Sequence, residues 1–91
     1  MTWQLVFTEQ YIRRAAKFLQ RNPAIETQYT KALELLELNP HHPSLRLHAL
    51  RRRLAGLHSV SINLKYRITI ELIITDQEIV LVNVGDHDTV S

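Results

Sequence analysis

The alternation of apolar and polar residues at the start of the chain predicts a strand followed by a helix. Residues 2–7 combine aromatic and β-branched side chains with a loose period of two, which indicates a short strand. Thr8 stands where a helix N-cap would, and helical spacing follows from Tyr11 to about Arg21. The apolar positions that we expect this helix to bury are Ile12, Ala15, Ala16 and Leu19.

A second helix is predicted directly after the first. Pro23 is tolerated at a first helical position, and Asn22 before it is a suitable cap. The helix should end near Asn39, because Pro40 disfavours helical geometry in the residue before it. Its apolar stripe consists of Ile25, Tyr29, Ala32, Leu33 and Leu36. Since the link between the helices is short, we expect an antiparallel helical hairpin that covers a sheet.

The second half of the chain supplies that sheet. Residues 45–50 read as a strand, with Leu45 and either Leu47 or Leu50 pointing inward. From Val60 to Leu72 every even position is apolar and the odd positions are mostly polar, which is typical of a sheet with one buried and one solvated face.

This alternating run is longer than most single strands, so we place a hairpin turn at residues 63–65. Another turn at residues 75–77 precedes a nearly continuous apolar strand over residues 78–84, which Gly85 is expected to end. The predicted fold is α+β: two helices packed on one face of a twisted, mainly antiparallel sheet, in the order β-α-α-β-β-β with one further strand.

Composition limits the class of protein. Residues 1–91 are enough for one small domain, and 45% hydrophobic residues are typical of a folded chain. The sequence has no cysteine, no signal peptide at its N-terminus and no apolar run of the roughly 20 residues that a membrane span needs. We therefore expect a cytoplasmic protein without a membrane partner.

Charge is distributed unevenly along the chain. Residues 46–67 hold six of the eleven Lys and Arg residues and no acidic residue, whereas residues 68–91 hold five acidic residues and no Lys or Arg. The net charge of +2 hides this asymmetry. A block of one sign indicates either a solvated face or a surface for a polyanion.

The polar residues of the predicted sheet would suit cleavage of an RNA backbone. Alternation places Lys65 and Arg67 on the solvated face, His48 on the strand that leads in, and His87 just after the last strand. In that reaction the ribose 2′-OH attacks the neighbouring phosphorus, which requires a group to accept one proton and a group to donate another. Histidine suits both transfers near neutral pH, and arginine suits the charge on the phosphorane.

Each of these residues also has a purely structural interpretation. A histidine at a strand end is commonly a surface residue, and Arg51–Arg53 could protect an edge strand from aggregation. Arg67 could form a surface ion pair with Glu71 or Asp76. The histidine spacing matches no usual zinc pattern, so we expect no metal and no cofactor.

Two segments at the C-terminal side resemble a known family. The residues HALRRRLAGLHSVSINLKYRITI, followed by IVLVNVGDHDTV, are similar to the RelE/ParE superfamily of bacterial type II toxins, and most to its RelE and YafQ branch. That branch has the pattern H-x-L-x-G-x-L-x-G, then S-x-x-I, Y-R-I and I-G-x-H-D-x-V-Tyr. The matching positions are His48, Leu50, Leu54, Gly56, Ser59, Ile62, Tyr66, Arg67, Gly85, His87, Asp88 and Val90.

The resemblance implies a toxin that cleaves mRNA in the ribosomal A site without a metal and is inhibited by a cognate antitoxin. It implies that His87 and His48 transfer protons and that Arg67 contacts the phosphate. Which histidine is the base and which is the acid stays open. The antitoxin is expected to be a partly disordered, acidic or amphipathic segment. The surface implied for RNA and the ribosome comprises Arg46, Arg51, Arg52, Arg53, Ser61 and Lys65.

The chain departs from the pattern at several positions. Ser91 replaces the C-terminal aromatic residue, Arg52 replaces a glycine, and Ser61 and Lys65 replace a histidine and an aspartate. These changes predict a weakened nuclease or a relative that acts mainly by binding its antitoxin. A ParE-type inhibitor of DNA gyrase on the same fold is the other alternative.

Overall fold

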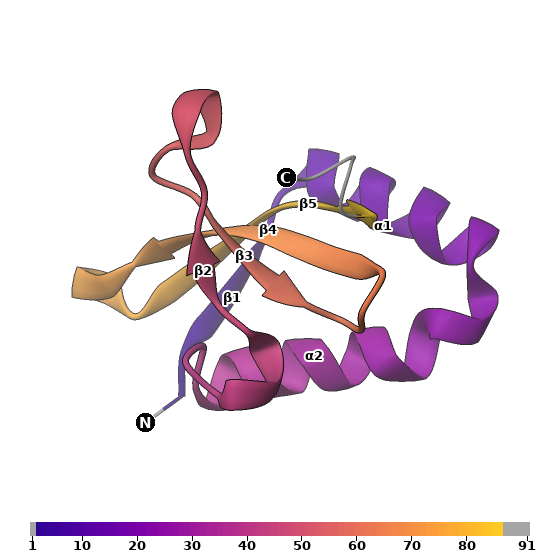
Figure 1. The fold of residues 1–91 in the computed structure, drawn as a ribbon, viewed down its shortest axis with the longest axis horizontal. Coiled ribbons are helices and arrows are strands. Elements are labelled where there is room, and N and C mark those ends of the chain that lie inside the picture. Colours follow the sequence, from indigo (N-terminus) through magenta and orange to yellow (C-terminus); the bar gives the residue numbers. More distant parts are fainter. Residues whose placement is uncertain (1, 87–91) are drawn as a thin grey trace.

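The computed structural model describes residues 2–86, which form a mixed five-stranded sheet with two helices packed on it (Figure 1). The strand order is β1-β5-β4-β3-β2, and all pairs are antiparallel except β1 with β5, which is parallel. The predicted α+β fold and its element order are confirmed. The strands are β1 (Gln4–Phe7), β2 (His48–Ala49), β3 (His58–Ser61), β4 (Tyr66–Ile73) and β5 (Glu78–Asp86).

Both helices lie where the sequence predicts them. Helix α1 (Glu9–Arg21) begins after Thr8, whose hydroxyl accepts a hydrogen bond from the Tyr11 N–H at 3.1 Å. Helix α2 (Glu26–Leu38) follows a 3₁₀ turn over Pro23–Ile25. Within residues 2–86, neither helix is long and apolar enough to cross a membrane.

Two details of the helices differ from the prediction. The buried residues of α1 are Tyr11, Ala15 and Phe18, whereas the predicted Ile12 is 53% exposed. The stripe is rotated because the large aromatic rings take the interior. Asn22 does not cap α2; its side chain donates to the Phe18 carbonyl at 2.9 Å and so closes the end of α1.

The β3–β4 hairpin turns at the predicted residues. The Asn63 side-chain oxygen accepts hydrogen bonds from the backbone N–H groups of Lys65 and Tyr66, at 2.8 and 2.9 Å. This local pairing is an Asx-type turn, for which asparagine is favoured. The predicted turn before β5 is also present, as a 3₁₀ turn over Ile74–Asp76.

Three predictions about the sheet are wrong. The strand predicted for residues 45–50 is reduced to β2, because the preceding residues form a 3₁₀ turn over Pro43–Leu45 and Arg46 turns the chain in the left-handed conformation. Strand β5 continues through Gly85 to Asp86 instead of ending at Gly85. The polar face is not solvated at its centre, where Ser59, Ser61 and Thr69 are buried.

A pair of phenols joins the two helices inside the core. The hydroxyls of Tyr11 on α1 and Tyr29 on α2 lie 2.6 Å apart, and Tyr11 is completely buried. Burial raises the pKa of both phenols above the ordinary value. A phenol that keeps its proton in the folded state stabilises the protein below pH 10 or so, and that stability is lost as the pH rises further.

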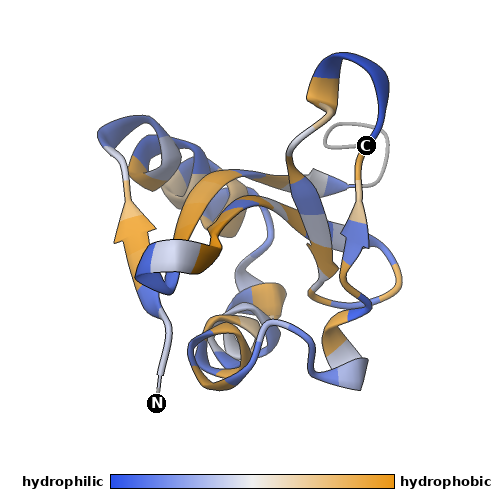
Figure 2. Cartoon of the chain, turned by 90° about the vertical axis from the view of Figure 1, so that its left-hand side faces the viewer, coloured by the Kyte–Doolittle hydropathy of each residue, from blue (hydrophilic) through white to orange (hydrophobic). Residues whose placement is uncertain are grey.

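The connection between β2 and β3 projects away from the sheet and from α2, and its tip is hydrophilic (Figures 1 and 2). It contains a 3₁₀ turn over Arg52–Leu54, and Arg51, Arg52 and Arg53 are all exposed. Arg52 has φ 60°, in the left-handed region that favours glycine. The backbone therefore keeps a glycine-like conformation at the position where the resembled pattern has glycine.

We predict that Tyr11→Phe and Tyr29→Phe each lower the free energy of unfolding by about 1–2 kcal/mol, since each leaves one buried hydroxyl without its partner. The double variant should lose much less than the sum, because both polar groups are then absent. Urea unfolding of the four proteins at pH 7 measures this cycle, and strictly additive losses would contradict it.

We predict that Arg52→Gly raises the free energy of unfolding by up to about 1 kcal/mol, because the left-handed backbone costs an arginine more than a glycine. Arg53→Gly removes the same side chain from a neighbouring residue that is not left-handed and should give no gain. Equal effects of the two substitutions in urea unfolding would exclude backbone strain as the cause.

Candidate functional site

The side chain of Arg67 connects three segments that are far apart in the sequence. Its Nε donates to the Ser59 hydroxyl at 2.6 Å, and its Nη2 donates to His48 Nδ1 at 3.0 Å and to the Arg46 carbonyl at 3.3 Å. These four residues, Arg46, His48, Ser59 and Arg67, form what we term the Arg67 cluster. Two of the predicted catalytic residues, His48 and Arg67, are therefore in direct contact.

Strand register brings these residues to one face of the sheet. His48 on β2 lies opposite Ser59 on β3, and Ser61 on β3 lies opposite Arg67 on β4. Tyr66 points the other way and packs edge-on against Phe18 of α1, with ring centroids 5.0 Å apart. Since successive strand residues face opposite sides, the Arg67 cluster lies on the face away from α1.

The left-handed conformation of Arg46 aims its carbonyl at the cluster. The 3₁₀ turn before it is held by the His42 imidazole, whose Nδ1 accepts from the Ser44 N–H at 3.1 Å. Arg46 then has φ 49° and ψ 49°, and its carbonyl reaches both the Arg67 guanidinium and, at 3.4 Å, His48 Nδ1.

The contact with Arg67 defines the tautomer of His48. A guanidinium has only donors, so Nδ1 must accept in the 3.0 Å hydrogen bond, and Nε2 carries the ring hydrogen. The opposite tautomer would donate from Nδ1 to the Arg46 carbonyl at the longer distance of 3.4 Å. Only one of the two bonds can exist at a time.

Burial lowers the pKa of the Arg67 guanidinium from its ordinary value, and the nearby charge of Arg46 lowers it further. The group remains charged at neutral pH because an arginine pKa starts so high. A cation that is partly desolvated and faces a like charge gains more from a bound anion than an exposed cation does. The bonds within residues 2–86 use Nε and Nη2, so Nη1 can meet an incoming phosphate.

The other residues predicted to bind RNA are dispersed. Ser61 is buried beside Arg67, and its hydroxyl donates to the Asn63 carbonyl at 2.6 Å. Arg51–Arg53 occupy the projecting β2–β3 connection. Lys65 is exposed at the hairpin turn, where its Nζ lies 5.2 Å from the Tyr66 ring centroid.

His87 lies outside the described residues, as do Asp88, Val90 and Ser91. Asp86, the residue before it, pairs with Tyr66, and Gly85 pairs with Arg67. Among residues 2–86, no three His, Cys, Asp or Glu side chains gather in a way that could hold a metal ion.

Sequence reasoning missed a second group of cations. Arg14, Lys17 and Arg21 line a pocket of about 420 Å³ between α1 and the end of the sheet, together with Lys65. The signal was present, since positions 14, 17 and 21 recur at helical spacing and share one face. Sequence reasoning also missed Ser59, which belongs to the resembled pattern but was not expected to contact Arg67.

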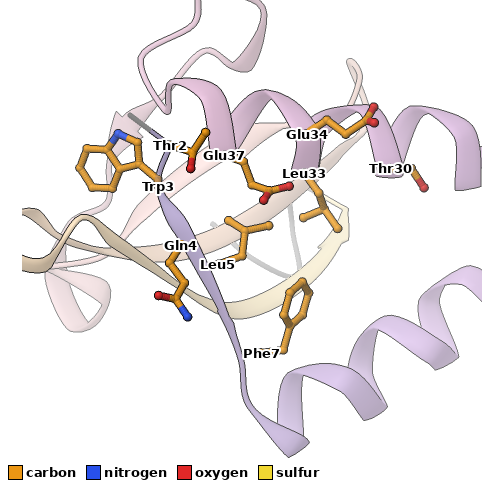
Figure 3. A pocket seen from close by; sticks show the side chains of 9 residues that line it. All are labelled: Thr2, Trp3, Gln4, Leu5, Phe7, Thr30, Leu33, Glu34 and Glu37. Atoms are coloured by element: carbon orange, nitrogen blue, oxygen red, sulfur yellow. The ribbon is translucent and has the colours of Figure 1, made fainter.

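Another pocket contains none of the predicted site residues. It is a groove of about 630 Å³ between β1 and α2 (Figure 3). Leu5, Phe7 and Leu33 supply apolar surface, and Glu34 and Glu37 supply the acidic side. Phe7 is 47% exposed, and β1 is an edge strand that pairs only with β5 among the described strands.

Several solved structures of bacterial toxins have a similar fold. A chain of the E. coli DinJ–YafQ toxin–antitoxin complex is 18% identical with a TM-score of 0.75, and the match covers 98% of this chain and 97% of that one. A YoeB/ParE toxin from Agrobacterium tumefaciens is 17% identical with a TM-score of 0.70, covering 92% and 98%. A chain of the RelBE2 toxin–antitoxin complex from Mycobacterium tuberculosis is 23% identical with a TM-score of 0.66, covering 96% and 100%.

No protein-family model matches the chain, and no curated protein matches it in sequence. The structural matches nevertheless show that the protein has the fold of the RelE, ParE, YoeB and YafQ toxins of toxin–antitoxin systems, as the sequence resemblance predicted.

We predict that His48 carries its ring hydrogen on Nε2 at pH 8 and that Arg67→Gln weakens this preference, because the charged donor to Nδ1 is lost. Long-range ¹H–¹⁵N correlation spectra of ¹⁵N-labelled protein distinguish the two tautomers. His41, an exposed histidine outside the cluster, is the internal control and should not respond. A protonated Nδ1 on His48 in the unmodified protein would contradict the geometry.

Proposed function

We propose that this protein is the toxin of a type II toxin–antitoxin system and that it cleaves mRNA on the ribosome. The observation that carries the proposal is the Arg67 cluster, in which a partly buried guanidinium is hydrogen-bonded to the imidazole of His48. The toxin fold of the chain supports it, and so does the identity of YafQ and YoeB among the proteins that share this fold.

The reaction needs no metal or cofactor. The ribose 2′-oxygen attacks the adjacent phosphorus, its proton passes to a base, and the 5′-oxygen leaves with a proton from an acid. The products are a 2′,3′-cyclic phosphate and a 5′-hydroxyl. Arg67 would bind the phosphate through Nη1 and stabilise the charge of the phosphorane, which is the kind of interaction that lowers such barriers most.

Arg67 also couples phosphate binding to the state of His48. In the free protein Nε2 carries a hydrogen and cannot accept one. When a phosphate draws the guanidinium away from Nδ1, Nδ1 takes up a proton from water, keeps it, and donates a hydrogen bond to the Arg46 carbonyl. Nε2 loses its own proton to water, so the charge of the ring is unchanged. Nε2 then has a free lone pair and serves as the base for the 2′-OH.

His87 is the proposed acid for the leaving 5′-oxygen. The remaining predicted cations, Arg46, Arg51, Arg52, Arg53 and Lys65, would contact RNA of the message and the ribosome, where affinity is electrostatic and depends on salt. Ser61, the buried neighbour of Arg67, would support the same surface. A protein with this target would act in the cytoplasm.

We propose an antitoxin partner as well, in line with the toxin–antitoxin complexes among the similar structures. The groove between β1 and α2 is suited to an amphipathic segment, because it offers apolar surface, acidic side chains and an edge of β1 with which no described strand pairs (Figure 3). A segment bound there would leave the Arg67 cluster uncovered unless it continued across the sheet.

The alternative with a specific observation in its favour is inhibition of DNA gyrase without catalysis, since the Agrobacterium protein of the same fold carries the name ParE as well as YoeB. That function would not depend on His48 or His87. A toxin weakened by its substitutions, Ser91 above all, would show the same cuts at a lower rate.

We predict that primer extension on an mRNA in a reconstituted translation reaction detects cuts that require ribosomes. His48→Ala and His87→Ala should each slow cleavage by about 10²–10⁴-fold, and Arg67→Ala by about 10²–10³-fold. His41→Ala removes an exposed histidine outside the cluster and should cleave normally.

A message with sulfur in place of the 5′-bridging oxygen separates the two histidines, because a thiolate leaves without a proton. It should restore cleavage by His87→Ala but not by His48→Ala. Translation without cuts, together with gyrase inhibition by the His48→Ala variant, would replace this proposal with the ParE-type function.

A further inference from the structure

The pocket against α1 is strongly charged, and of its cations only Lys65 has a role in the function proposed above. It is lined by four cationic side chains and one carboxylate, and its volume is about 420 Å³. The cations are Arg14, Lys17 and Arg21 of α1 and Lys65 of the hairpin turn. We propose that this pocket binds consecutive phosphates of a single RNA strand.

The α1 cations form a line that matches a strand of phosphates. Arg14, Lys17 and Arg21 lie on one helix face, and seven residues of α-helix extend about 10 Å. A stacked nucleic-acid strand advances about 3.4 Å per phosphate, so this line spans about three nucleotides.

One end of the line is fixed in place. The Arg14 guanidinium donates from Nη1 to the Val82 carbonyl of β5 at 3.0 Å, so its charge is held over the sheet before any ligand arrives. The pocket wall is also rigid, because the Tyr66 hydroxyl donates to the Asn22 side chain at 2.9 Å. Less conformational entropy is lost when an anion binds to groups that are already positioned.

The pocket adjoins the Arg67 cluster around the end of the sheet. Tyr66 and Gly85 line the pocket, and these are the chain neighbour and the strand partner of Arg67. The Arg67 cluster faces away from α1 and the pocket faces α1, so one strand that passes this end of the sheet could contact both. This continuity favours RNA over an acidic protein segment, and in that respect the inference rests on the proposed function.

Equilibrium binding of a fluorescent 2′-O-methyl RNA 12-mer tests the pocket, because that RNA cannot be cleaved. The variant Lys17→Gln/Arg21→Gln should reduce the slope of log K against log salt by about 1.4, which is about 0.7 for each lost phosphate contact. If the two proteins bind equally at 1 M salt, this difference in slope makes the variant bind about 25-fold more weakly than the unmodified protein at 0.1 M salt.

Arg13→Gln/Lys31→Gln is the matched control, since it also removes two exposed helical cations, and neither of them lines the pocket. The inference is overturned if the control and pocket variants lose equal affinity. It is also overturned if a polyglutamate peptide of the same charge displaces the RNA from the unmodified protein as well as unlabelled RNA does, because the pocket would then recognise acidic protein.

Primer extension separates this inference from the function on which it rests. If the unmodified protein makes no cuts but the pocket variant alone loses affinity for RNA, the pocket assignment holds and the nuclease assignment fails. If cuts appear and the pocket variant makes them at the control rate with unchanged RNA affinity, the nuclease assignment holds and the pocket assignment fails.

Discussion

The alternation of side chains along β4 is the constraint on which both sides of the molecule depend. Tyr66 and Arg67 are adjacent in sequence, and the pleat sends the tyrosine toward α1 and the arginine to the opposite face. Slipping the register of β4 by one residue would exchange the two faces, placing a guanidinium in the core and an aromatic ring on the polar face. Packing of the helices therefore also determines where the cation lies.

The pairing of Arg67 with Ser59 shows how the fold tolerates a partly buried cation. Ser59 is completely buried, and its hydroxyl accepts a hydrogen bond from the guanidinium. His48 and the Arg46 carbonyl accept from the same side chain. Strand β2 can be as short as two residues because it needs to place only the imidazole of His48 beside Arg67.

The sequence patterns predicted the element order well because apolar periodicity reports burial directly, as at Tyr29, Ala32 and Leu36. The patterns failed where two alternative local structures have similar free energies. In α1 the size of Tyr11 and Phe18 decides which stripe faces inward, and periodicity does not weigh size. At Arg46 the local hydrogen bonds of the preceding 3₁₀ turn prevail over strand propensity and place the residue in the left-handed conformation. The residue types in this segment did not predict that outcome.

The sequence could predict several residues of the candidate site but not how they contact one another. His48 and Arg67 came from residue chemistry and from the resemblance, but their contact depends on strand register, which depends on the whole sheet. The partnership of Arg67 with Ser59, and the meeting of Lys65 with the cations of α1, likewise require long-range geometry. His87 lies outside the described residues, so its place in the site stays a prediction.

The parallel pairing of β1 with β5 has a consequence for how the protein is made. Gln4 pairs with Glu78, so nearly the whole described chain must be synthesised before the first strand has a partner. Pairings of such long sequence separation form late, after the entropy of closing the intervening loop has been overcome. A nascent chain thus emerges with its first strand unpaired, and the sheet of the described residues is complete only once β5 has left the ribosome.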